Sequence, residues 1–213
     1  MSGPTQDHPI KIFQRVGAGF TRLGSSLLAP HALFRSLLIL IKRGDEIMVF
    51  YVVIRGPLGV GKSTVAESLA KRIAAEHISI DRILDEHGLE EWDGGYISQK
   101  SFLRANARAI EQARVFLEQG TPVIFDGNFY WKSQIEDLLI QLDYRHFVFT
   151  LKAPLGVCIE RDSGRKPPHG MEAARDVYAK VAEFDYGTLL DATRPVGSMV
   201  REIISQLPRE HIP

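Results

Sequence analysis

The sequence predicts an α/β fold in which helices cover a parallel β-sheet. Short runs rich in β-branched and aromatic residues occur at 48–54, 77–81, 121–125 and 146–151, and each is long enough for a strand. The first run, M-V-F-Y-V-V-I, has no polar alternation, which is typical of a strand buried on both faces of a parallel sheet. Longer segments with helical periodicity separate the runs, as connections between parallel strands require.

Composition and charge narrow the class of protein. The chain has 213 residues, 45% of them hydrophobic, which suits one domain with a sizeable core. Its 26 basic and 26 acidic residues balance, which excludes a generally basic nucleic-acid coat and a highly charged disordered chain. Cys158 is the single cysteine, so no intrachain disulfide can form. We therefore expect a cytoplasmic protein without a membrane span.

The first 47 residues differ in charge from the rest. Residues 1–44 carry six basic side chains and one acidic, whereas the chain from Met48 onward carries 20 basic and 23 acidic. We interpret 1–47 as an N-terminal extension and 48–213 as the folded domain. The extension is compatible with an Arg-rich targeting peptide, with an amphipathic segment that buries residues 37–41, with a disordered tail, or with a leader upstream of a true start at Met48.

A phosphate-binding loop is the clearest motif. Residues 56–63 read G-P-L-G-V-G-K-S and match G-x-x-x-x-G-K-[ST] at every fixed position, between the first strand and a predicted helix at 65–75. The glycines let backbone N–H groups turn toward phosphate oxygens, and the helix N-terminus adds positive charge. Lys62 can bridge β- and γ-phosphates, and the Ser63 hydroxyl can ligate Mg²⁺. A glycine turn that only caps a helix is the alternative. The predicted phosphate contacts are Gly56, Pro57, Leu58, Gly59, Val60, Gly61, Lys62, Ser63 and Thr64.

A carboxylate at the end of the 121–125 run suggests the second part of a magnesium site. Asp126 follows this run, and acidic residues at the carboxyl ends of such strands face Mg²⁺. The next residue is Gly127 rather than the Glu that polarises water in motor ATPases, and no N-K-x-D motif for reading guanine occurs. Phosphoryl transfer is therefore favoured over hydrolysis or a GTPase switch. A turn or helix cap is the alternative role for Asp126.

Asp81 is the candidate general base. It ends the predicted strand at 77–81, and the carboxyl ends of parallel strands line the ligand crevice. A carboxylate there can accept the proton of an attacking hydroxyl. Asp81 could instead be the N-cap of a helix at 83–87.

A second basic segment predicts a lid. Arg161 and Arg165 are four residues apart, a spacing that places them on one helix face, where ATP phosphates would neutralise their repulsion. Residues 167–170 read P-P-H-G and are a candidate hinge for closure over the site. The alternative is a solvated basic face paired with Glu160 and Asp162.

The remaining chain completes the pattern. We expect helices at 99–118, 173–184 and 196–206 and a short strand at 188–190. The aromatic residues 129–131 can stack on a planar substrate or simply pack.

These motifs together resemble the small P-loop kinases related to adenylate, gluconate and chloramphenicol kinases, of the AAA_33-like and zeta-toxin-like type. The resemblance covers most of 48–206 and implies a P-loop NTPase three-layer sandwich, with a five-stranded parallel sheet in the order 2-3-1-4-5, helices on both faces and a small lid. It also implies ATP and Mg²⁺ as cofactors, Asp81 as base, Arg161 and Arg165 as lid arginines, and an adenine-framing loop at 191–195 that includes Thr193.

A closer resemblance is to the kinase that phosphorylates seryl-tRNA. Its acidic strand end followed by N-[FM]-Y-x-x-S is similar to residues 126–133, and its C-x-x-R-x-x-x-R is matched by Cys158, Arg161 and Arg165. Gly127 departs from that family, which has a second acid there. We also expect this protein to lack the extra C-terminal tRNA-binding domain of that family.

The leading functional prediction is an ATP- and Mg²⁺-dependent phosphotransferase that acts on a hydroxyl of a small molecule. Catalysis would rest on Lys62, Asp81, Arg161 and Arg165, with Ser63 and Asp126 organising Mg²⁺. An RNA-, polynucleotide- or tRNA-directed kinase is the second hypothesis, and it predicts a basic, aromatic-lined groove. An ATP-binding regulatory module without an acceptor is the third. The predicted groove residues are Arg82, Arg104, Arg108 and Trp131.

Overall fold

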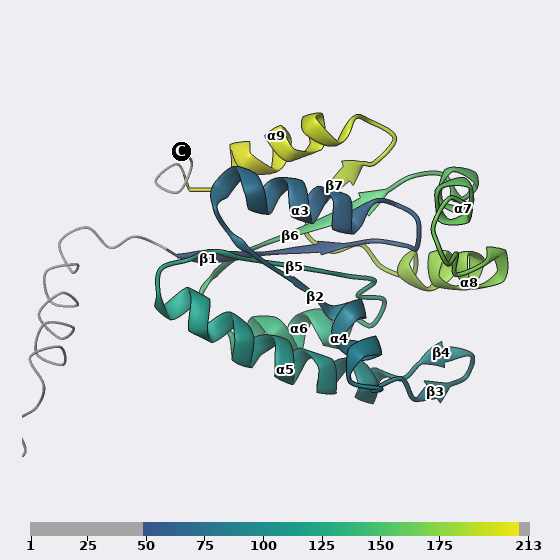
Figure 1. The fold of residues 1–213 in the computed structure, drawn as a ribbon, viewed down its shortest axis with the longest axis horizontal. Helices are drawn as coiled ribbons and strands as arrows, with labels where there is room; N and C mark the ends of the chain where they lie inside the picture. The colour runs from purple at the N-terminus through teal and green to yellow at the C-terminus, as the bar shows by residue number, and fades with distance from the viewer. Residues whose placement is uncertain (1–48, 209–213) are drawn as a thin grey trace, which may run out of the picture. The chain divides into compact units, whose positions relative to one another are not determined.

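Five parallel strands form the central sheet, in the order β2-β5-β1-β6-β7 (Figure 1). Strand β1 lies in the middle, and its Tyr51 pairs in register with Val123 of β5 and His146 of β6. Counted along the five strands of this sheet, the order is the predicted 2-3-1-4-5. The strands are β1 (Phe50–Arg55), β2 (Glu76–Ser79), β5 (Val123–Gly127), β6 (Arg145–Lys152) and β7 (Thr188–Asp191).

This computed structural model describes residues 49–208. The interpretations of residues 1–47 as an extension and of Met48 as a start fall outside the described residues. Within the described range, no helix is long and apolar enough to cross a membrane.

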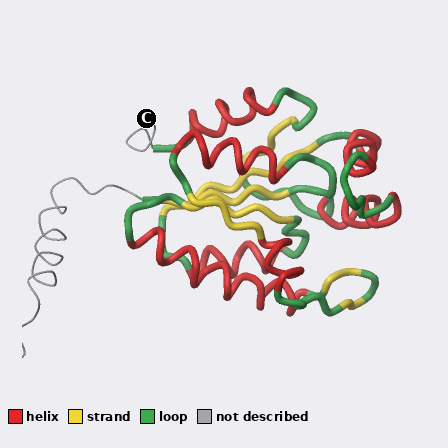
Figure 2. Tube along the Cα trace, viewed as in Figure 1, coloured by secondary structure: helices red, strands yellow, loops and turns green. Residues whose placement is uncertain are grey.

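Helices cover both faces of the sheet, which gives the three-layer architecture (Figures 1 and 2). Helices α3 and α9 lie on one face, α4, α5 and α6 on the other, and α7 and α8 lie beyond the carboxyl ends of the strands. The helices are α3 (Lys62–Ile73), α4 (Ile80–Glu86), α5 (Gln99–Glu118), α6 (Lys132–Gln141), α7 (Leu155–Ser163), α8 (Met171–Val181) and α9 (Val196–Gln206).

Two apolar cores stabilise the layers, one on each side of β1. Because successive side chains of a strand point to opposite faces, Tyr51 and Val53 belong to the core under α5, whereas Phe50, Val52 and Ile54 belong to the core under α3 and α9. All of β1 is buried, as the apolar run predicts. The central strand therefore holds the phosphate loop, which follows its last residue, at a rigid point of the fold.

A short antiparallel hairpin between α4 and α5 is absent from the sequence-based prediction. It pairs β3 (Trp92–Asp93) with β4 (Tyr96–Ile97) through Gly94 and Gly95, whose positive φ angles of 58° and 86° suit a two-residue turn. Tyr130 Oη and Trp131 Nε1 each donate a 3.1 Å hydrogen bond to Ile97 O. These aromatic side chains therefore fix the base of the hairpin.

Two predicted boundaries are wrong in ways that concern the site. Strand β2 stops at Ser79, and α4 begins at Ile80, so Asp81 lies in the first turn of a helix rather than at a strand end. The buried Ile80 side chain packs into the core under α5, which favours the earlier helix start. Helix α7 ends at Ser163, so Arg165 lies beyond its C-terminus rather than on its face.

Candidate active site

The phosphate loop, residues 56–61, joins the carboxyl end of β1 to the N-terminus of α3. Gly59 has a φ of 71°, and a Cβ there would lie only 2.0 Å from the carbonyl oxygen of Cys158. Any side chain at this position would push the loop away from α7. The loop glycine is thus required by a close backbone approach as well as by its conformation.

Lys62 lies under this loop and is 7% exposed. Its Nζ donates to Pro57 O at 2.9 Å and to Asn128 Oδ1 at 3.0 Å. Burial lowers the pKa of Lys62, and the nearby carboxylates of Asp81 and Asp126 oppose this effect. The ammonium is thus already desolvated, as a group that binds phosphate oxygens should be.

The predicted magnesium ligands are brought together. Ser63 Oγ donates a 2.7 Å hydrogen bond to Asp126 Oδ2, and His77 Nε2 lies 2.6 Å from Asp126 Oδ1. Burial by itself raises the pKa of Asp126, but the hydrogen bonds from His77 and Ser63 outweigh it and hold that pKa below its usual value. The carboxyl group is therefore ionised at neutral pH, in the form that binds a cation.

A hydroxyl beside an ionised carboxylate is a donor set that fits Mg²⁺. This ion prefers oxygen ligands and keeps several waters, so it needs only one or two protein groups beside the nucleotide phosphates. Within residues 49–208, no group of three or more His, Cys, Asp or Glu side chains is placed to hold a metal without such help.

Asp81 faces the same loop from α4. Asn128 N and Nδ2 donate to Asp81 Oδ1 at 3.4 and 3.5 Å. Burial raises the pKa of Asp81 above its ordinary value, although the charge of Lys62 opposes the shift. A raised pKa strengthens the carboxylate as a proton acceptor. The side chain of Asn128 thus contacts both Lys62 and Asp81.

Arg161 closes a cavity of about 220 Å³ beside the phosphate loop. Its Nη1 donates to Val60 O at 3.3 Å and to Ala192 O at 3.0 Å, so one guanidinium joins the loop to the connection between β7 and α9. Thr193, predicted in the nucleotide site, does not line this cavity, because its N and Oγ1 both donate to Asp191 Oδ1. The cavity is lined by Val60, Gly61, Thr64, Arg161, Ala192, Arg194, Val196 and Met199.

Arg165 is exposed, and it acts on the site through its charge. Burial lowers the pKa of Lys62, and the positive charge of Arg165 lowers it further. Because α7 ends at Ser163, Arg161 and Arg165 do not share a helix face, which corrects the prediction from their spacing.

The segment after α7 is held by Asp162, which is 2% exposed. Its Oδ2 accepts from the backbone N–H groups of His169 and Gly170 at 3.0 and 3.1 Å, and His169 Nδ1 lies 2.8 Å from Oδ1. Burial alone raises the pKa of Asp162, but the hydrogen bonds from His169 and Gly170 outweigh burial and lower it. The predicted hinge at 167–170 is therefore tied to α7 at its last two residues.

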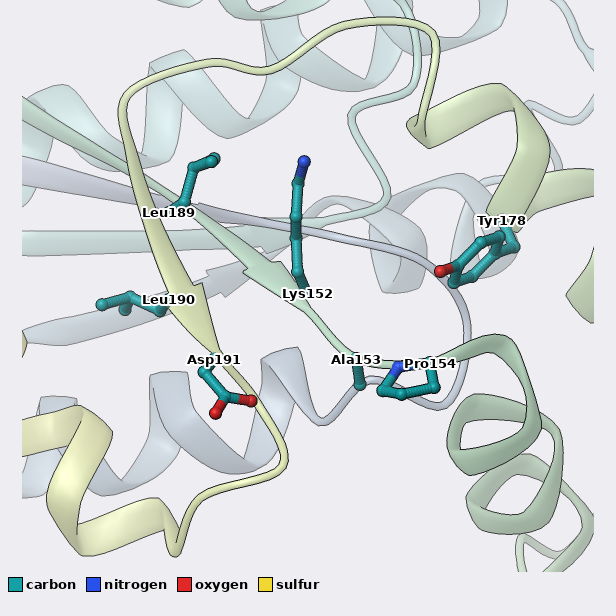
Figure 3. Close-up of a pocket in the computed structure, with 7 residues that line it drawn as sticks. All are labelled: Lys152, Ala153, Pro154, Tyr178, Leu189, Leu190 and Asp191. Atoms are coloured by element: carbon teal, nitrogen blue, oxygen red, sulfur yellow. The ribbon is translucent and has the colours of Figure 1, made fainter.

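The larger open groove lies elsewhere (Figure 3). It measures about 450 Å³ between the end of β6, the edge strand β7 and helix α8. None of its lining residues belongs to the phosphate loop, and the Lys152 ammonium is paired with Asp185 Oδ1 at 2.5 Å. This groove is therefore not the phosphate site. Its lining residues are Lys152, Ala153, Pro154, Tyr178, Leu189, Leu190 and Asp191.

Three contributors were missed from sequence as parts of the site: His77, Asn128 and the buried Arg55. His77 reaches Asp126 because β2 pairs with β5, and that pairing is not visible in local sequence. The sequence signal for Asn128 was its position two residues after Asp126, near the carboxyl end of β5. A basic residue in an otherwise apolar strand was the signal for Arg55, which donates hydrogen bonds to four oxygen atoms.

Comparison with known proteins agrees with the architecture. A family model described as an AAA domain (AAA_33) matches residues 52–184, which include the end of β1, the phosphate loop and helices α7 and α8. Uncharacterized proteins of Mycobacterium tuberculosis and Mycobacterium bovis are 27% identical in an alignment of 175 residues, and the match covers 76% of this chain. The chain spans about a third of their length, since the match covers 35% of each.

Solved structures share the fold at low sequence identity. A gluconokinase from Sinorhizobium meliloti superimposes with a TM-score of 0.58 at 17% identity, covering 74% of this chain and 91% of its own. A sugar kinase from Janibacter superimposes with a TM-score of 0.61 at 16% identity, covering 74% of this chain and 93% of its own. The APS kinase of Mycobacterium tuberculosis, in complex with AMPPNP and APS, superimposes with a TM-score of 0.56 at 18% identity, covering 74% of this chain and 96% of its own. These likenesses show that the chain has the α/β fold of a P-loop NTPase.

Proposed function

Because the chain belongs to the AAA_33 family of AAA domains, we propose that it is an ATP- and Mg²⁺-dependent kinase whose acceptor is a hydroxyl of a small molecule. The phosphate loop and Lys62 would hold the β- and γ-phosphates. Ser63 and Asp126 would hold Mg²⁺, which when bound neutralises charge on the phosphates. The cavity beside Arg161 would take the nucleoside.

The observation that carries this proposal is the bridge made by Asn128. Its Oδ1 accepts from Lys62 Nζ at 3.0 Å, while its Nδ2 lies 3.5 Å from Asp81 Oδ1. A phosphate-binding ammonium and a candidate base are therefore separated by a single amide. Phosphoryl transfer needs this proximity, because the attacking oxygen must lie in line with the γ-phosphorus while its proton is removed.

The proposed step uses the residues as follows. The Asp81 carboxylate accepts the proton of the acceptor hydroxyl, and the hydroxyl oxygen forms a bond to the γ-phosphorus. The bond from the γ-phosphorus to the β–γ bridging oxygen breaks, and ADP leaves with that electron pair. Lys62, Arg161 and Arg165 stabilise the charge that the moving group spreads over its oxygens.

A small acceptor is favoured over RNA by the charges of the insertion between α4 and α5. Two of the four residues expected to line a basic groove have partners elsewhere: Arg104 is paired with Glu91 Oε1 at 2.6 Å, and Trp131 Nε1 bonds to Ile97 O. The insertion itself is acidic, which repels a phosphate backbone. The gluconokinase, sugar kinase and APS kinase among the structural neighbours are consistent with a small acceptor. The acids of the insertion are Glu90, Glu91 and Asp93, and residues 87–98 contain no Lys or Arg.

The test is to incubate the purified protein with γ-labelled ATP and Mg²⁺, separately with a metabolite extract and with total RNA. We expect label to move to a small species, which can then be identified. Label that moves only to RNA would replace this proposal with the RNA-directed kinase. Tight ATP binding with no transfer to either would leave an ATP-binding module.

A further inference from the structure

Arg55 is the last residue of β1, directly before the phosphate loop, and its side chain is completely buried. The guanidinium makes four hydrogen bonds to parts of the chain that are far apart in sequence. Nε donates to Phe129 O at 3.3 Å, Nη1 to Phe184 O at 3.0 Å and Thr150 Oγ1 at 3.3 Å, and Nη2 to Val181 O at 3.1 Å.

The charge of Arg55 has no carboxylate among these four acceptors. Its guanidinium instead lies 4.2 Å from the centre of the Phe184 ring and faces backbone carbonyls at the end of α8, where a helix carries partial negative charge. Burial lowers its pKa to about 10, and the charge of Asp185 opposes that effect, so the group is charged at neutral pH. Burying a charge is unfavourable, and an apolar side chain would fill the space at lower cost. The presence of a buried guanidinium at this position is therefore best explained by the segments that its hydrogen bonds join.

One connection leads to the candidate base. The Phe129 carbonyl that accepts from Arg55 belongs to a residue with a φ of 44°, a left-handed conformation that is uncommon outside glycine. Phe129 directly follows Asn128, which contacts both Lys62 and Asp81. The hydrogen bond from Arg55 thus holds the unusual backbone that aims the Asn128 side chain.

The other connection leads to the candidate lid, which consists of helices α7 and α8 and the segment between them, residues 155–181. Val181 is the last residue of α8, and Phe184 lies in the segment that returns from α8 to β7. Asp162 ties the start of α8 to α7, which carries Arg161. The helices of the lid are therefore joined at one end, and Arg55 anchors the other end beside the phosphate loop.

We propose that Arg55 is a positioning residue that couples the lid to the phosphate loop, by holding the end of α8 and the Phe129 carbonyl with one guanidinium. The part of this inference that concerns lid closure over bound nucleotide rests on the proposed function. The anchoring itself does not depend on that function. Nucleotide on the phosphate loop would favour the closed lid through this link, and loss of the link would separate nucleotide binding from lid ordering.

The test compares the wild type with Arg55→Lys by amide hydrogen exchange of the full chain. In the free proteins, we expect Arg55→Lys to raise exchange about tenfold in residues 127–131 and 181–187 together, because lysine cannot reach all four acceptors. With AMP-PNP and Mg²⁺, the variant should retain protection of residues 56–64 and an affinity within about threefold of wild type, yet lose protection of residues 155–181.

Two further variants complete the test. Tyr51→Phe is the matched control, since it removes another buried side-chain hydrogen bond of β1, to Leu142 O at 3.5 Å, at the opposite end of the strand. Tyr51→Phe should leave unchanged both the exchange of the free protein in residues 127–131 and 181–187 and the protection of residues 155–181 with AMP-PNP and Mg²⁺. Phe184→Leu removes the ring beside the guanidinium and should weaken lid protection in the same direction. It decides the matter if Arg55→Lys does not fold.

The outcomes separate the inference from the proposed function. Lid protection in Arg55→Lys equal to wild type would overturn the coupling, as would an equal loss of protection in the lid and the phosphate loop, which is the result of general destabilisation. If AMP-PNP fails to protect residues 56–64 even in the wild type, the proposed function falls. The exchange rates of the free proteins then still decide whether Arg55 anchors the two segments.

Discussion

Ser63 Oγ donates a 2.7 Å hydrogen bond to Asp126 Oδ2, although the two residues lie 63 positions apart in the chain. The contact forms because β1 and β5 are neighbours in parallel register, with Arg55 opposite Gly127, so that the phosphate loop and the end of β5 meet at one edge of the sheet. Their oxygen atoms mark the place where Mg²⁺ would bind beside the phosphates of ATP.

Asp126→Asn should therefore weaken the response to Mg²⁺ more than the binding of nucleotide. We expect the Mg²⁺ concentration for half-maximal phosphoryl transfer to rise at least about tenfold, because a neutral amide attracts a divalent cation poorly. A Mg²⁺ titration of transfer at saturating ATP measures this. Asp143→Asn, an exposed acid before β6, is the control. An unchanged titration in Asp126→Asn would remove Asp126 from the metal site.

Asp81→Asn should bind ATP normally and lose transfer, by about a hundredfold or more, since general-base catalysis contributes about 10²–10⁴. Asp85→Asn, one turn later on the same helix, should retain the rate. A full transfer rate in Asp81→Asn would make the base assignment wrong.

The same residue predicts a pH dependence. Burial raises the pKa of Asp81 above its ordinary value of 3.8, and only the deprotonated carboxylate can accept a proton. The transfer rate should thus fall on the acid side along a limb centred above pH 3.8, and the residual rate of Asp81→Asn should lack this limb. Transfer rates of the wild type and Asp81→Asn between pH 4 and 8 test this. If both proteins show the acid limb, a titrating group other than Asp81 causes it.

How far the sequence alone predicts this site depends on the range of each interaction. The phosphate loop and its helix are local patterns, and the structure bears out the predicted sheet order. The exact end of β2 was not predictable, because Ile80 fits either a strand or a helix until the core under α5 is known. Contacts such as His77 with Asp126 depend on pairing between distant strands.

The hairpin at 92–97 is a different kind of miss. Asp93-Gly94-Gly95 is a recognisable turn signal, but each flanking strand is only two residues long, too short for an alternating pattern to appear. Arg165 was predicted on the helix of Arg161 because the two residues are four positions apart. Helix α7 ends at Ser163, so Arg165 lies outside it.

Arg161→Ala should raise the KM for ATP about tenfold, because it removes the side chain that joins Val60 to Ala192 across the cavity beside the loop. Arg175→Ala, an exposed arginine of α8, should not change it. Initial-rate kinetics at varied ATP provide the measurement. Equal KM values for Arg161→Ala and the wild type would show that the nucleoside binds elsewhere.

Asp162→Asn should lower the free energy of unfolding by about 1.5–3 kcal/mol at pH 7, since it weakens three hydrogen bonds to a buried carboxylate. The folded pKa of Asp162 is lowered, so its contribution is present above the unfolded value of about 3.9 and disappears as pH falls through the folded pKa. Denaturant unfolding at pH 7 and pH 3 should show a smaller difference between the two proteins at pH 3. A constant difference would contradict this account.

The most direct measurement is transfer of labelled γ-phosphate from ATP to a metabolite extract by the wild type, Lys62→Ala and Lys71→Ala. Lys62 is buried under the loop, whereas Lys71 is exposed in the last turn of the same helix. We predict that the wild type and Lys71→Ala label the same small species at similar rates, and that Lys62→Ala is slower by about 10²–10³. Labelling by Lys62→Ala at the wild-type rate, or none by any of the three, would contradict the proposal that this site transfers phosphate to a small acceptor.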